Sequence, residues 1–222
     1  MLLTWMWKFG ETMSDFCKQE TDKVLLVEGI NDCHVVMALC NVHDVPETFG
    51  IYQCDSDDGV LKRLNALIRS PNPPQVIGIM LDADTSLEGR WASIQSKLKH
   101  YNYVFPSSPD AHGTVIESSS YETKLGFWLM PNNQTSGMLE DFCAELAEPT
   151  SLAFAQECVE QASTKKVTTF KKVHCSKAAI HTYLAWQDEP GYPLGKAITR
   201  QALRPHTQIA ISFTDWLKSL FT

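Results

Sequence analysis

The strongest constraint on the fold is a pair of short apolar runs, each ending directly in acidic residues. Residues 24–27 precede Glu28 and Gly29, and residues 76–81 precede Asp82 and Asp84. Such runs are typical of strands buried on both faces of a sheet. A further strand is expected at 49–54, and helical spacing of apolar residues marks 32–42, 57–68 and 86–100. This alternation predicts an α/β fold, a Rossmann-like parallel sheet flanked by helices.

The second half of the chain has a different pattern. Residues 114–117 and 125–130 are expected to be strands, either an antiparallel edge pair or two strands that flank an insertion. The pattern is then helical, with helices expected at about 138–147, 151–163, 176–187, 195–202 and 207–220. We therefore expect an N-terminal extension (1–21), an α/β core (22–135) and a helical C-terminal part packed on that core (136–222).

Composition limits the class of protein. The 222 residues are 44% hydrophobic and 20% charged, which excludes disordered, collagen-like and coiled-coil chains. No apolar run reaches the roughly 18 residues that a membrane-spanning helix needs. The apolar start is a poor signal peptide because charged residues follow closely and no cleavage site is evident, so a cytoplasmic protein is expected. The seven cysteines lack CxxC or paired Cys/His spacing, which favours reduced thiols over a zinc site.

Charge is distributed unevenly along the chain. Residues 1–161 hold 10 basic and 23 acidic residues, whereas residues 162–222 hold 9 basic and 3 acidic ones. This asymmetry suggests an acidic, metal-binding part beside a basic part that meets phosphate. The alternative is that two solvated surfaces simply differ in charge.

The acidic residues that follow the strands are the first candidate site. Ligands of open parallel sheets bind beyond the carboxyl ends of the strands. If the two strands are neighbours, Glu28, Asp82 and Asp84 converge, since alternation in an extended segment points both aspartates the same way. Carboxylates gathered in one cleft repel one another unless a cation neutralises them, and Mg²⁺ or Mn²⁺ suits such hard oxygen ligands. The alternative is that the aspartates cap the following helix while Glu28 pairs with a lysine.

These motifs resemble a known superfamily. The segment VLLVEGINDCHVV followed by VIGIMLDADTS is similar to the Toprim superfamily, which includes topoisomerases, bacterial primases and overcoming-lysogenisation-defect nucleases. The segments WLMPNNQTSGMLEDF and HCSKAAIHTYLAWQDEPGYPLG also resemble small standalone Toprim proteins related to that nuclease branch. The resemblance extends over residues 22–222 and implies a Toprim-like fold.

The resemblance also implies roles for individual residues. Glu28 matches the Toprim glutamate, a metal ligand or general acid/base, and Asp82 and Asp84 match the metal-binding pair. Asp32 matches an additional acid of the nuclease branch. Glu140 is a candidate ligand for a second metal, although the adjacent Asp141 is an alternative.

Basic residues in the last third complete the candidate set. Lys177 matches a lysine that stabilises charge on the phosphate, and His181 shares its helix face at spacing i, i+4. A further basic cluster is suited to a nucleic-acid backbone and comprises Lys165, Lys166, Lys171 and Lys172. A solvated loop explains this cluster equally well, and His181 also fits a packing role.

The functional expectation is a metal-dependent nuclease that hydrolyses phosphodiester bonds of DNA or RNA. The resemblance implies a context of phage defence with an ATPase partner, and a homodimer is plausible for a small nuclease. One alternative is a non-catalytic Toprim-like module that binds nucleic acid or a partner. Another is a haloacid-dehalogenase-like phosphatase with Asp82 as nucleophile. The phosphatase ranks lower because Ser86 stands where that motif has Thr or Val.

Overall fold

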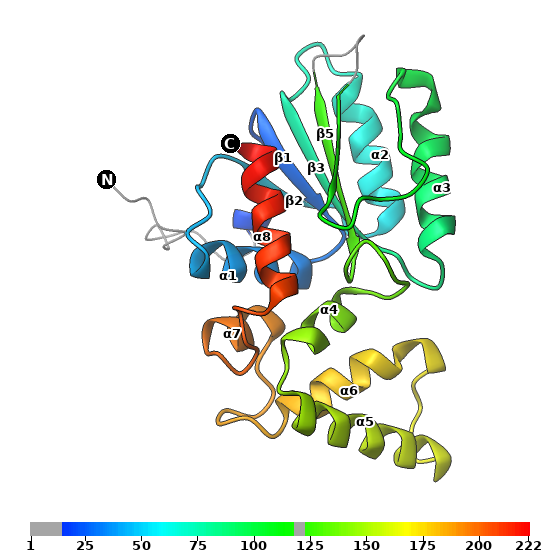
Figure 1. The fold of residues 1–222 in the computed structure, drawn as a ribbon, viewed down its shortest axis with the longest axis vertical. Helices are drawn as coiled ribbons and strands as arrows, with labels where there is room; N and C mark the ends of the chain where they lie inside the picture. Colours follow the sequence, from blue (N-terminus) through cyan, green and yellow to red (C-terminus); the bar gives the residue numbers. More distant parts are fainter. Residues whose placement is uncertain (1–14, 118–122) are drawn as a thin grey trace.

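The computed structural model describes residues 15–117 and 123–222, and a five-stranded sheet lies at its centre (Figure 1). The strand order is β2-β1-β3-β5-β4. The strands β2, β1, β3 and β5 are parallel, and β4 pairs antiparallel with β5. The strands are β1 (Lys23–Val27), β2 (Gly50–Gln53), β3 (Val76–Asp82), β4 (Thr114–Ile116) and β5 (Lys124–Met130). The predicted α/β class with a mostly parallel sheet is confirmed.

Helices cover both faces of this sheet. Apolar side chains of α2 and α3 pack on one face, and those of α1 and α8 pack on the other (Figure 1). The helices are α1 (Ile30–Val42), α2 (Asp57–Ile68), α3 (Leu87–Leu98), α4 (Leu139–Leu146), α5 (Pro149–Thr164), α6 (Cys175–Leu184), α7 (Leu194–Thr199) and α8 (Gln208–Phe221). None of the helices in the described part of the chain is long and apolar enough to span a membrane.

The strand order places a switch point between β1 and β3. From β1 the chain passes through α1 to β2 on one side, and α2 then returns it to β3 on the other side. Loops that leave the carboxyl ends of two such strands diverge, and the crevice between them is where ligands bind in open α/β sheets. Glu28 follows β1 directly and Asp82 ends β3, so both acids lie at this crevice.

Two glycines of the sheet face α8 and allow its side chains to approach the strands closely. Gly78 of β3 and Gly126 of β5 are paired in register. A Cβ atom at Gly78 would lie 2.8 Å from the Phe221 ring, and one at Gly126 would overlap the Leu220 side chain. Any larger residue at these two positions would therefore force α8 away from the strands.

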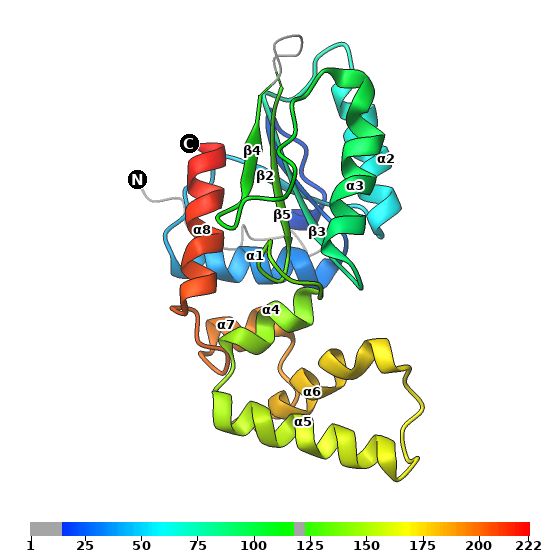
Figure 2. The ribbon, with the colours of Figure 1, turned by 45° about the vertical axis from the view of Figure 1, so that its right-hand side comes forward.

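The remaining helices lie beyond the carboxyl ends of the parallel strands (Figures 1 and 2). The helix α4 follows β5, and α5 and α6 form a helical hairpin that contacts it through α6. The helix α7 packs along α1, and one apolar cluster contains buried residues of α1, α4, α6, α7 and α8. The helices expected from apolar spacing after residue 138 are all present, with ends shifted by a few residues.

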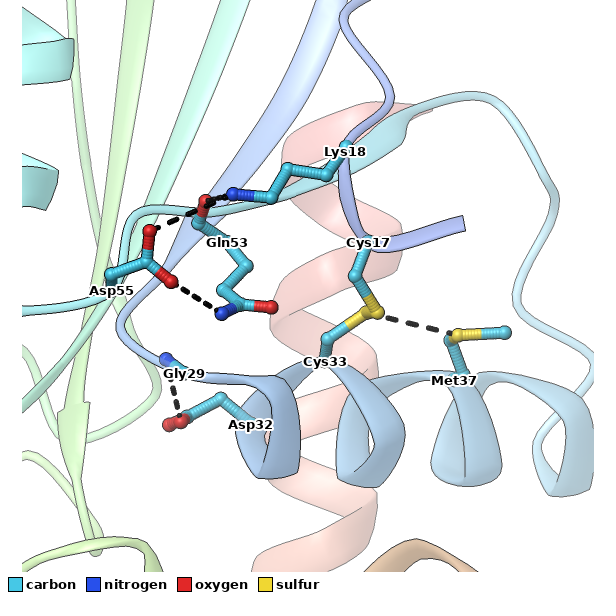
Figure 3. Close-up of a disulfide and its surroundings, with 8 residues drawn as sticks. All are labelled: Cys17, Lys18, Gly29, Asp32, Cys33, Met37, Gln53 and Asp55. Carbon is cyan, nitrogen blue, oxygen red and sulfur yellow. Dashed lines mark hydrogen bonds and ion pairs between the residues drawn. A yellow bond between two sulfur atoms is a disulfide. The ribbon is translucent and has the colours of Figure 1, made fainter. Parts of the chain in front are cut away.

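The segment before β1 corrects the prediction for two cysteines. Cys17 and Cys33 form a disulfide between this segment and α1, so the expectation of reduced thiols is wrong for this pair (Figure 3). Lys18 also forms an isolated antiparallel β-bridge with Tyr52 of β2 through its backbone. This bridge attaches part of the expected N-terminal extension to the sheet. Sequence spacing gave no indication of this disulfide, because the two cysteines meet only through the tertiary fold. Cys40 and Cys143 are buried free thiols.

Candidate functional site

Glu28 and Asp82 are connected directly at the carboxyl ends of β1 and β3. The backbone N–H of Asp82 donates a hydrogen bond to Glu28 Oε1 over 2.9 Å. Both residues are half-buried, and neighbouring parallel strands bring them together, as predicted from the acids that follow each apolar run. This contact fixes the Glu28 carboxylate at the crevice between the strands.

Asp32 lies in the first turn of α1, next to this pair. The helix begins after Gly29, whose backbone N–H donates to Asp32 Oδ2 over 3.0 Å (Figure 3). An acid at this position stabilises a helix N-terminus because it accepts from an otherwise unpaired N–H group and meets the positive end of the helix dipole. Asp32 is thus a helix cap, and it also interacts electrostatically with Glu28 and Asp82.

The helix α4 contributes the fourth acid. Its first N–H, from Leu139, donates to Asp82 Oδ1 over 2.9 Å and so brings the helix N-terminus to the end of β3. Glu140 is 6% exposed, and its charge acts on both Asp32 and Asp82. Asp141 instead accepts from the N–H of Met138 over 2.8 Å as a cap of the same helix. Of the two alternatives on α4, Glu140 is therefore the one that faces the acidic cluster.

We use the name acidic cluster for Glu28, Asp32, Asp82 and Glu140. Burial and then the charge of Glu28 raise the pKa of Asp82 to about 8 and that of Asp32 to about 7. The pKa of Glu28 is also raised, mainly by burial, although the hydrogen bond from Asp82 and the charge of Arg90 oppose the shift. The repulsion between carboxylates that are buried together opposes folding. Carboxylates with such raised pKa values are therefore typical of functional sites.

Asp84 lies outside the acidic cluster. Its φ of +53° ends the extended conformation, so the alternation expected from Asp82 to Asp84 does not hold. Its backbone N–H donates to the Gly137 carbonyl over 2.8 Å, and its carboxylate pairs with Arg90. The other guanidinium nitrogen of Arg90 lies 2.7 Å from Asp57 of α2. Asp84 still acts on Glu28 electrostatically, so it borders the cluster on the α2–α3 side.

The predicted basic residues divide into two groups. Lys177 of α6 lies 2.9 Å from Glu140 and thus borders the acidic cluster. The other group is exposed. It comprises four lysines on or beside the α5–α6 connection, Lys165, Lys166, Lys171 and Lys172, together with His181 on α6. Figure 2 shows this connection at one end of the α5–α6 hairpin, directly before α6. Of these six basic residues, only Lys177 forms an ion pair with the acidic cluster in the described part of the chain.

Arg90 and Asp57 are the site residues that sequence reasoning missed. Arg90 is four residues from the Ser86 cap of α3, and Asp57 is in the first turn of α2. Both helices begin at the carboxyl edge of the sheet, so their first turns lie beside the ends of β1 and β3. The position of Arg90 was the signal that could have identified it, since it lies near the N-terminus of the helix that follows the Asp-x-Asp segment. Cations are disfavoured at that end of a helix unless acids surround them.

The donor set of the acidic cluster fits a hard divalent cation. All its charged atoms are carboxylate oxygens, and the charges of Glu28, Asp32 and Glu140 all raise the pKa of Asp82. Within the described ranges, however, no three Asp, Glu, His or Cys side chains are gathered in a ready ligand arrangement. Asp82, Asp84 and Glu140 each bind a protein donor in this arrangement.

Comparison with known proteins assigns a family. Residues 22–222 match the family model described as "Protein of unknown function (DUF3226)", and the chain belongs to this family. No curated protein matches the chain, and no solved structure matches it. The family match covers the sheet and all helices from α1 to α8, and hence every residue of the acidic cluster.

Proposed function

We propose that this protein is a Mg²⁺- or Mn²⁺-dependent nuclease that hydrolyses phosphodiester bonds of DNA or RNA. The observation that carries the proposal is the acidic cluster at the switch point of a parallel sheet, with Lys177 beside it. The Toprim-like pattern of Glu28, Asp82 and Asp84 gives the same interpretation independently of the fold.

Each residue of the site has a role in this proposal. Glu28, Asp32 and Asp82 would hold the cation, with Glu140 and Asp84 as further oxygen ligands. A bound cation of this kind activates water and stabilises charge on a phosphate. Lys177 is about half-exposed, so its ammonium group is accessible to a phosphate oxygen while Glu140 orients it. A cation at this place also removes the repulsion that raises the pKa values of Asp32 and Asp82.

Nucleic acid is the substrate class that fits the remaining charges. The exposed lysines of the α5–α6 connection supply positive charge beyond the site, where a backbone longer than one nucleotide would extend. An ATPase partner, a second copy of the chain and a role in phage defence follow from the sequence resemblance alone and are part of this proposal.

The test is a cleavage assay with plasmid, single-stranded DNA and tRNA in Mn²⁺ or Mg²⁺. We expect cleavage by the wild type and a loss of about 100-fold or more in Glu28→Gln and Asp82→Asn, because each change removes a negatively charged ligand of the proposed cation. Glu157→Gln is the matched control, since Glu157 is exposed on α5 and accepts a hydrogen bond from Gln161 of the same helix. Metal-dependent binding of nucleic acid without cleavage would favour the non-catalytic alternative, and equal cleavage by all variants would contradict the site.

A further inference from the structure

Arg90 is held between two carboxylates at the edge of the acidic cluster. One guanidinium nitrogen lies 2.7 Å from Asp57, and the other pairs with Asp84. The Arg90 side chain is 11% exposed, whereas those of Asp57 and Asp84 are 42% and 48% exposed. The buried member of this triad is therefore the cation, and it also acts electrostatically on Glu28.

This arrangement blocks one of the expected metal ligands. Arginine stays protonated at all accessible pH values, so the guanidinium cannot release Asp84 by losing its charge. A divalent cation that binds the Asp84 carboxylate must displace the Arg90 nitrogen that now occupies it. The nitrogen on Asp57 need not move, because separate guanidinium nitrogens bind the two carboxylates, which come from different segments: α2 and the loop between β3 and α3.

We propose that Arg90 is an internal counter-ion that competes with the divalent cation for Asp84, and that Asp57 anchors Arg90 when Asp84 is released. This inference rests on the proposed metal site and adds its regulation: the cation affinity is set by the Arg90–Asp84 contact. Arg90 is thus a positioning residue that acts through Asp84.

The structure shows why this device acts on one side of the site only. Lys177 forms a similar ion pair with Glu140, but the Lys177 side chain is 48% exposed and can turn into solvent. Arg90 is confined by burial and has a second carboxylate within reach. Only Arg90 therefore retains a fixed partner after displacement, so it returns to Asp84 when the cation leaves.

The competition predicts opposite effects for two substitutions. Arg90→Gln removes the competitor, so Mn²⁺ should bind about tenfold more tightly, as expected when a binding-competent state rises from about a tenth to nearly all molecules. Asp57→Asn removes the anchor and leaves Arg90 on Asp84 alone, so Mn²⁺ should bind several-fold more weakly. A purely structural role for the triad would weaken Mn²⁺ binding in both variants.

Matched controls separate this effect from a general change in charge. Arg63→Gln removes an arginine whose partner is Glu20, away from the cluster, and Asp58→Asn removes the neighbouring acid, which pairs with Lys62. Each control should change the affinity for Mn²⁺ less than twofold. A loss in Asp58→Asn equal to that in Asp57→Asn would overturn the role of Asp57 as anchor.

The measurement is calorimetric titration of MnCl₂ into the full chain at low ionic strength, with thermal melts to verify folding. Tighter binding by Arg90→Gln together with weaker binding by Asp57→Asn supports the proposal. Unchanged or weaker binding by Arg90→Gln, with a wild type that binds Mn²⁺, overturns the competition and leaves the metal site intact. Absence of Mn²⁺ binding in the wild type and in Arg90→Gln overturns both this inference and the proposed metal dependence. If Arg90→Gln fails to fold, Asp57→Asn alone decides.

Discussion

The ammonium group of Lys177 lies 2.9 Å from the Glu140 carboxylate, and this ion pair joins α6 to α4. The Glu140 side chain is 7% exposed and that of Lys177 is 48% exposed, so a buried anion is paired with a cation at the surface of the site. The contact links the helical hairpin to the acidic cluster, because Glu140 also acts on Asp32 and Asp82.

Lys177→Met should lower kcat for nucleic-acid cleavage about 100-fold, since it removes a positive charge from the phosphate in the transition state. KM should change little, because the exposed lysines of the α5–α6 connection remain. Lys196→Met is the matched control: Lys196 has similar exposure and pairs at 2.7 Å with Glu189, which is not a member of the acidic cluster. A rise in KM without a change in kcat would assign Lys177 to substrate binding alone.

The same substitution should also destabilise the fold, because Glu140 would be left buried without a cation. The double variant Lys177→Met/Glu140→Gln should recover the lost stability in urea unfolding but not the lost activity. Recovery of both would show that Lys177 acts only through the packing of α4 and α6.

Asp82→Asn should stabilise the cation-free protein at alkaline pH. The pKa of Asp82 is about 8 in the fold against an ordinary 3.8, so the folded state retains a proton that the unfolded state loses. Its contribution to the free energy of unfolding therefore declines as pH rises from about 4 to 8. Asparagine keeps an acceptor for the Leu139 N–H and removes the charge, so its Tm at pH 8.5 should be higher by about 3 °C or more.

Thermal melts in chelator and in Mn²⁺ measure this effect. Mn²⁺ should raise the Tm of the wild type and leave that of Asp82→Asn nearly unchanged. Asp188→Asn, an exposed acid beyond α6, should behave as the wild type in both conditions. A lower Tm for Asp82→Asn in chelator at pH 8.5 would contradict the interpretation of the cluster as a site of uncompensated charge.

Reduction of the Cys17–Cys33 disulfide should lower the free energy of unfolding by about 3 kcal/mol, as expected for a crosslink that closes a loop of roughly 15 residues. Urea unfolding with and without a dithiol reductant measures this difference, and Cys17→Ser/Cys33→Ser should show none. Because disulfides are rare in reducing cytoplasm, alkylation of the protein directly from cells also tests the expected localisation. Labelling of Cys17 and Cys33 in unreduced protein would show that the pair is present as thiols.

Gly126→Ala should destabilise the protein by about 1–3 kcal/mol, because the added methyl group would overlap the Leu220 side chain. Leu220→Ala in the same chain should offset part of this cost, which a double-mutant cycle in urea would show as a coupling energy. Gly89→Ala in α3 is the control, since its nearest neighbour is the small Ser86 side chain at 3.2 Å. Strict additivity of Gly126→Ala and Leu220→Ala would exclude the proposed close contact.

The convergence of Glu28 and Asp82 was predictable because both acids directly follow apolar strands, and parallel strands align their carboxyl ends. The role of Lys177 at the phosphate was inferred only from resemblance, and its contact with Glu140 was not predicted, since nothing in local spacing connects α4 with α6. The orientation of Asp84 was not predictable: a positive φ at a non-glycine residue leaves no pattern in apolar periodicity. Arg90 was missed for a similar reason, because its partners belong to different elements and meet only after the sheet has formed.

The glycine pair under α8 has a consequence for how the chain folds during synthesis. Gly78 and Gly126 form a shallow track that Leu220 and Phe221 of α8 fill, so this part of β3 and β5 stays uncovered until that helix has been synthesised. Buried strand surface that waits for a distant segment is open to association with other nascent chains. Chaperone dependence should therefore concentrate in the interval between translation of residue 130 and emergence of α8.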